Sequence, residues 1–147
     1  MRLLRFTIAC LFVLLLALPA FAITAKDLPT EKEKALAGDS LSQVNVGDYY
    51  YARNRYEEAL PWYQMAAAQG RIDARQRLAY MYREGLGTPQ DLVKSYVLSY
   101  KIFQRYKDKM HPEGYAYYEQ YLPEMAARLS PEQLAEAERM LAEPWQY

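Results

Sequence analysis

The feature that most constrains the fold is a pair of similar segments in the middle of the chain. Val46-Gly47 in the first segment corresponds to Leu78-Ala79 in the second, and Tyr50 corresponds to Tyr82, in both cases 32 residues further along the chain. Small residues recur where helices would cross closely, and large ones recur where a gap must be filled. Segments of this length are typical of helix–turn–helix units that stack and bury a core between neighbours. We therefore expect an array of helical repeats, which usually serves as a binding scaffold.

Helical periodicity runs through the chain, and no segment alternates apolar and polar residues as a strand would. Ser130, Pro131 and Gln133 form a strong start signal, because the serine caps the helix and the glutamine reciprocates. Thr30 and Glu33 form a second capping box. The expected helices span 31–37, 41–52, 56–69, 72–84, 91–106, 113–128 and 131–142. We predict an all-α fold, a short right-handed α-α superhelix (solenoid) of about two clear helix–turn–helix repeats plus a degenerate C-terminal helix pair.

The first 22 residues have the pattern of a secretory signal peptide. Arg2 and Arg5 precede an apolar run over residues 6–18, shorter than the roughly 20 residues of a membrane-spanning helix. Pro19-Ala20-Phe21-Ala22 then supplies small residues for cleavage after Ala22. We expect a periplasmic or secreted protein, with an uncleaved anchor as the alternative. The predicted parts are 1–22 as signal peptide, 23–36 as leader and short helix, 37–106 as repeats, and 107–147 as C-terminal capping helices.

Cleavage would leave the chain without cysteine, because its single cysteine, Cys10, lies within the apolar run. That excludes disulfides, thiolate catalysis and cysteine-bound zinc in the mature chain. The whole sequence has 18 basic and 18 acidic side chains, interspersed without a basic stripe or a charged block. We therefore expect neither nucleic acid nor, after signal cleavage, a membrane surface as the partner.

Several residues of the two segments follow a more specific pattern, namely Trp62-Tyr63, Ala66-Ala67, Gln69-Gly70 and the loop Gly85-Leu86-Gly87. With these residues the stretch from Ala37 to Tyr106 resembles the Sel-one-like repeat family, a relative of the tetratricopeptide repeats. The resemblance implies a stack of helix pairs that acts as a protein-interaction scaffold. Ser95 and Leu98 depart from the family pattern, which has alanine and an aromatic residue there. We expect looser packing in the second unit for that reason.

The resemblance also implies which side chains face the concave groove of the array. The residues so placed are Val44, Asp48, Tyr51, Gln76, Tyr80 and Arg83. Tyr50 and Tyr82 map instead to the core between helices. Because tyrosine and arginine are enriched among residues that dominate binding energies, the groove residues are candidates for a peptide-binding patch. The alternative is that they are ordinary half-exposed helix positions.

The sequence contains no motif for catalysis, cofactor binding or metal binding. His111 is the single histidine, and it precedes Pro112 in a link. The paired carboxylates lie on helices, whereas glycosidase chemistry needs two that face each other across a cleft. No nucleophile elbow, phosphate loop, dinucleotide fingerprint or zinc-binding helix is present.

We therefore expect no catalytic residue, no metal and no cofactor. The predicted function is an exported interaction module that binds a protein or peptide of the cell envelope in its groove. Two alternatives remain at this point. One is a hydrolase that acts on envelope material, and the other is an accessory or inhibitory subunit that occludes a partner.

Overall fold

The computed structural model describes residues 23–144, and the predicted signal peptide lies outside them. The described part is all-α, as the sequence predicts, and no helix in it is long and apolar enough to cross a membrane. Its helices are α2 (Leu28–Leu36), α3 (Ser40–Tyr51), α4 (Tyr56–Ala68), α5 (Ile72–Glu84), α6 (Leu92–Tyr106), the short 3-10 helix η1 (Lys107–Lys109), α7 (Pro112–Ala126) and α8 (Pro131–Ala142).

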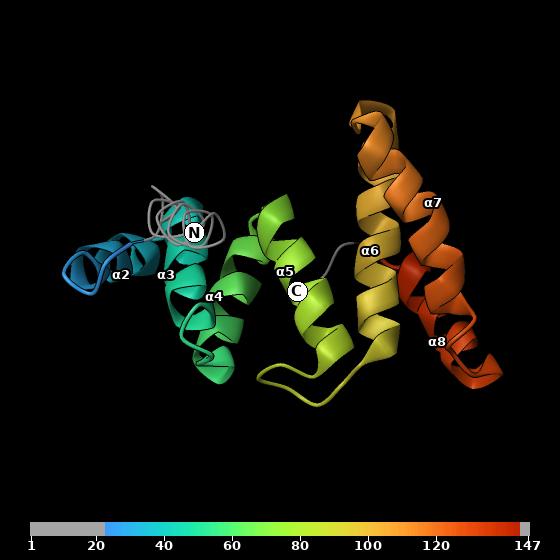
Figure 1. Ribbon diagram of the computed structural model, residues 1–147, viewed down its shortest axis with the longest axis horizontal. Coiled ribbons are helices and arrows are strands. Elements are labelled where there is room, and N and C mark those ends of the chain that lie inside the picture. The colour runs from blue at the N-terminus through green and yellow to red at the C-terminus, as the bar shows by residue number, and fades with distance from the viewer. Residues whose placement is uncertain (1–22, 145–147) are drawn as a thin grey trace, which may run out of the picture.

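From α2 to α7 each α-helix packs against the next, so this part of the fold is a stack that follows the chain order, and α8 packs back against α6 (Figure 1). Helix α3 pairs with α4, and α5 pairs with α6, which confirms the two helix–turn–helix units. Helix α2 packs against α3 ahead of the first unit, while α6 contacts both α7 and α8. The space between helices is filled by large side chains such as Tyr63, Leu78 and Met81, each 0% exposed.

Most helix ends follow from capping chemistry. The Asp39 carboxylate accepts a hydrogen bond from the Ser42 amide, and the capping box of Ser130 and Gln133 is present. The expected box at Thr30 is wrong, because α2 begins earlier, at Leu28. Proline in the first turn there has a backbone angle already suited to a helix and lacks an amide that would need a partner.

The two helices of the first unit approach most closely at Gly47. A Cβ atom on this residue would lie 2.7 Å from the ring of Tyr63, so only glycine leaves room for the tyrosine. The Tyr63 hydroxyl donates a hydrogen bond to Asp48 Oδ1 over 2.6 Å. The buried ring therefore has a partner for its polar end, which removes the cost of burying an unpaired hydroxyl.

The two units are also joined through a glycine loop. Gly85 ends α5 in the left-handed conformation, and Gly87 has a φ of +68°. A Cβ atom on Gly87 would lie 2.5 Å from the carbonyl carbon of Tyr56, at the start of α4. The loop of the second unit thus lies directly against the backbone of the first, and this contact requires glycine at position 87 for both its φ and its lack of a side chain.

One departure from the family pattern has a visible consequence in the core. Ser95, where the pattern has alanine, is 0% exposed on α6. Within residues 23–144 its hydroxyl is buried without a hydrogen-bond partner. Such a group loses its hydration without replacement, which destabilises the folded state.

We predict that Gly87→Ala lowers the free energy of unfolding by about 2 kcal/mol or more, because alanine is strained at positive φ and would collide with the α4 backbone. Gly114→Ala is the matched control, since nothing lies within 4 Å of its added Cβ. The control should raise stability by about 0.5 kcal/mol through helix propensity. Urea unfolding followed by circular dichroism measures both, and equal effects of the two variants would contradict the loop contact.

Two serines should respond to alanine with opposite signs. Ser95→Ala removes an unpaired buried hydroxyl and should stabilise the protein by about 1 kcal/mol. Ser130→Ala removes the cap of α8 and should destabilise it by about 1 kcal/mol. Thermal melts of the two variants beside the parent protein test both signs, and destabilisation by Ser95→Ala would mean that its hydroxyl has a partner in solution.

Candidate functional site

Side chains of α3, α5 and α7 form one connected surface, which we call the tyrosine–arginine face. It comprises Asp48 and Tyr51 of α3, Gln76, Arg77, Tyr80 and Arg83 of α5, and Tyr117 and Tyr121 of α7. Two arginines of α5 link its parts. The Arg77 guanidinium lies 5.6 Å from the ring centre of Tyr51, and the Arg83 guanidinium lies 5.7 Å from that of Tyr121. The first helix of each unit and the following α7 therefore contribute to a single surface.

The α3 end of the face is held by the core beneath it. Asp48 Oδ1 accepts the hydrogen bond from Tyr63 and lies 3.3 Å from Arg77 Nε, so one carboxylate connects α3, α4 and α5. Burial is the main cause that raises the pKa of Tyr63 above its usual range, and the bond to Asp48 acts in the same direction. The hydroxyl stays protonated at neutral pH and keeps its role as donor. Tyr51 packs edge-on against Tyr63, with ring centres 6.4 Å apart.

Val44 was predicted to face the groove, but the structure places it in the core. It is 6% exposed and belongs to the same buried cluster as Ala35 of α2. Val44 lies one turn before Asp48, which contacts Tyr63 of α4 and Arg77 of α5, so it is on the side of α3 that faces the following helices. Tyr50 is buried as expected, whereas Tyr82 is only partly buried and packs at the edge of the core.

Arg83 lies at the centre of the face. Its guanidinium is 5.0 Å from the ring centre of Tyr80, and its Nε donates to Glu84 Oε1 over 2.6 Å. Partial burial acts to lower the pKa of Arg83, but the Glu84 carboxylate and the Tyr121 hydroxyl outweigh it and raise the pKa above its usual value. The side chain is therefore a fixed positive charge held among aromatic rings, where cation–π attraction adds to its position.

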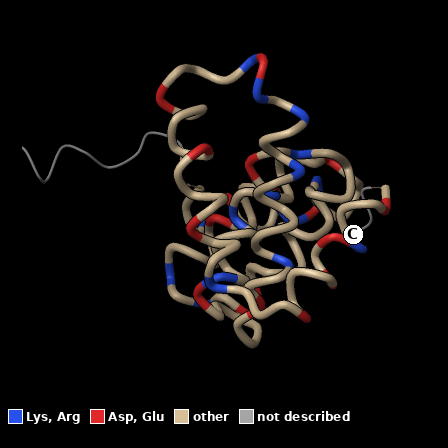
Figure 2. Tube along the Cα trace, turned by 90° about the vertical axis from the view of Figure 1, so that its right-hand side faces the viewer, with Lys and Arg blue, Asp and Glu red and all other residues tan. Residues whose placement is uncertain are grey.

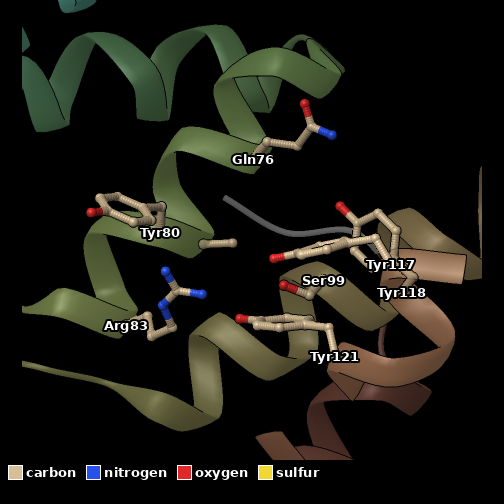
Figure 3. Close-up of a pocket in the computed structure, with 8 residues that line it drawn as sticks. Gln76, Tyr80, Arg83, Ser99, Tyr117, Tyr118 and Tyr121 are labelled. Atoms are coloured by element: carbon tan, nitrogen blue, oxygen red, sulfur yellow. The ribbon is translucent and has the colours of Figure 1, made fainter. Parts of the chain in front are cut away.

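A pocket of about 180 Å³ opens between α5 and α7, with α6 as its floor (Figure 3). Its lining residues are Gln76, Ala79, Tyr80, Arg83, Ser99, Tyr117, Tyr118 and Tyr121. The hydroxyl ends of the α7 tyrosines point toward α5, where the guanidinium of Arg83 points back at them (Figure 3). Three of the residues expected from the sequence line this pocket, namely Gln76, Tyr80 and Arg83.

The contribution of α7 was not predicted. Tyr117 and Tyr121 are four residues apart on one side of α7, and their rings stack with centres 5.3 Å apart and planes within 13°. Tyr117 is 54% exposed, so much of its ring is open to a binding partner. The i, i+4 spacing shows from the sequence that the two tyrosines share one side of α7. It does not show that this side faces the groove, because α7 does not align with the two repeats.

Neither a cluster of like charges nor a metal-binding group distinguishes this surface in the part of the chain that the structure describes. Basic and acidic residues alternate along the described trace rather than gathering by sign (Figure 2). Among residues 23–144, no group of three histidine, cysteine, aspartate or glutamate side chains could hold a metal ion. The side chains that gather on the face offer hydrogen-bond donors, aromatic rings and one arginine with a raised pKa.

Comparison with known proteins gives local sequence relatives and a shared fold, while no family model matches the chain. Protein sel-1 homolog 2 of Rattus norvegicus is 38% identical over 63 residues, which cover 40% of this chain and 9% of the rat protein. The Mus musculus protein of the same name is 36% identical over 63 residues with the same coverage. The match therefore spans about a tenth of the length of these curated relatives.

A solved structure extends the likeness to most of the chain. It is the crystal structure of c5321, described as a protective antigen present in uropathogenic Escherichia coli strains displaying an SLR fold. It matches with a TM-score of 0.63 and 21% identity, over 79% of this chain and 24% of that one. The chain therefore has an SLR fold, and over 63 residues its sequence is similar to that of the sel-1 homolog proteins.

Proposed function

We propose that the chain is an exported, non-enzymatic interaction module that binds a protein segment along the tyrosine–arginine face. Helical repeats of this kind are generally scaffolds for protein interaction, because stacked helices present an extended surface. The observation that carries the proposal is the set of tyrosine–arginine contacts on this face, in which Arg77 lies beside Tyr51 and Arg83 lies beside Tyr80 and Tyr121.

The exposure and the residue types of this face support binding there. Tyr80 and Tyr117 are 42% and 54% exposed, and they lie on opposite sides of the pocket between α5 and α7. Both have large rings that would bury apolar area against a partner while the hydroxyl keeps a hydrogen bond. Arginine and tyrosine are also the residue types that most often dominate binding energies at interfaces.

The first test removes these two rings. We expect Tyr80→Ala combined with Tyr117→Ala to reduce retention of the partner from an envelope extract by at least tenfold, because two central rings are lost. The full chain is immobilised, and the amount of retained protein is compared between the parent and the double variant by quantitative mass spectrometry.

Tyr115→Ala serves as the matched control. Tyr115 is 37% exposed on the same helix, but its ring lies against Phe103 at 5.3 Å rather than in the pocket. Retention by the control should equal that of the parent. If the double variant gives the circular dichroism spectrum of the parent and still retains the partner in full, the face is not the binding surface.

The export part of the proposal rests on the pattern of residues 1–22. Expressed from its full sequence in a Gram-negative host, the protein should accumulate in the periplasmic fraction with Ile23 as its first residue. Edman sequencing or intact mass of the fractionated protein measures this. Recovery of the chain from the cytoplasm with residues 1–22 still attached would contradict export.

A further inference from the structure

The pocket between α5 and α7 has an unbalanced set of lining groups. Arg83 is the only ionised side chain among the lining residues, and no carboxylate is among them. Every other polar group there is neutral and able to donate a hydrogen bond, from the amide of Gln76 and the hydroxyl of Ser99 to those of the tyrosines. Such a lining favours an acceptor that carries negative charge.

We infer that this pocket receives an acidic side chain, glutamate or aspartate, of the protein segment bound along the tyrosine–arginine face. The inference rests on the proposed function, since it names the residue class that the same face would recognise. The Arg83 guanidinium would bind one carboxylate oxygen, and hydroxyls from α6 and α7 would donate to the other.

The geometry of Arg83 leaves it able to take a second carboxylate. Glu84 occupies its Nε, at 2.6 Å, while the terminal nitrogens of the guanidinium point into the pocket (Figure 3). A guanidinium has five N–H donors and a carboxylate accepts several hydrogen bonds, so the two acidic groups do not compete for one donor. The rings of Tyr80 and Tyr121, 5.0 and 5.7 Å from the guanidinium, hold it in this orientation.

The floor of the pocket supports the same occupant. Ser99 is only 4% exposed, and its hydroxyl points into the pocket from α6 (Figure 3). The volume of about 180 Å³ suits a single side chain, because a cavity of roughly 150 Å³ already accepts a benzene molecule. The volume of the pocket, its hydrogen-bond donors and the positive charge of Arg83 thus all favour a short, anionic side chain as the occupant.

The test begins with a library of random ten-residue peptides displayed on phage and selected on the immobilised full chain. Selected sequences should share an acidic residue at one position. Each is then synthesised with an amidated C-terminus, once as selected and once with that glutamate changed to glutamine. Fluorescence anisotropy should show at least a tenfold loss of affinity for the glutamine peptide, since a charge-assisted hydrogen bond is lost.

Variants of the protein then locate the carboxylate. Arg83→Gln should bind the two peptides with equal affinity, and Ser99→Ala should reduce the preference for glutamate in part. Arg139→Gln is the matched control, because Arg139 lies on α8 with its side chain 75% exposed and outside the pocket. It should keep the full preference. Circular dichroism spectra that match the parent show that each variant is folded.

The outcomes separate the two proposals. Peptides that require Tyr80 and Tyr117 but ignore both the glutamate-to-glutamine change and Arg83→Gln would overturn the acidic subsite and leave the interaction face standing. A preference for glutamate that persists in Arg83→Gln would also overturn the subsite. A library that yields no peptide dependent on Tyr80 and Tyr117 would count against the proposed function itself, and the subsite would fall with it.

Discussion

The packing of α3, α4 and α5 depends on one partly buried hydrogen bond, from the hydroxyl of Tyr63 to the carboxylate of Asp48. The ring of Tyr63 fills the space over Gly47 between α3 and α4. The Asp48 carboxylate that accepts the bond also pairs with Arg77 of α5. A single tyrosine thereby closes the first unit and, through Asp48, is linked to the second. Because the same carboxylate lies on the surface, the packing of the core and the layout of the tyrosine–arginine face share a residue.

The helices of the two central units could be predicted because their signals are local. Asp39 caps α3, and Gly85 ends α5 in the left-handed conformation. Both effects depend on backbone groups within one turn, so the sequence is sufficient to place them. The bounds of α5, Ile72–Glu84, agree with the prediction at both ends.

The candidate site was predicted less completely, for reasons that lie outside any one helix. Whether Val44 faces solvent depends on how closely the following helices pack against α3, which the periodicity of α3 alone does not determine. Tyr117 and Tyr121 join the face because α6 holds α7 beside α5, which is a tertiary relation. Gln76, Tyr80 and Arg83 could be assigned to one surface because they share a helix and a register with the first unit. Their role in binding remains a prediction.

The contact of the Gly87 loop with the start of α4 is made by backbone atoms on both sides. Its closeness therefore does not depend on the size or charge of any neighbouring side chain. At this point the spacing between the two units is set by backbone atoms rather than by side chains. Surface residues that, unlike Asp48, take no part in the packing of the core can change to suit a different partner without altering this backbone contact.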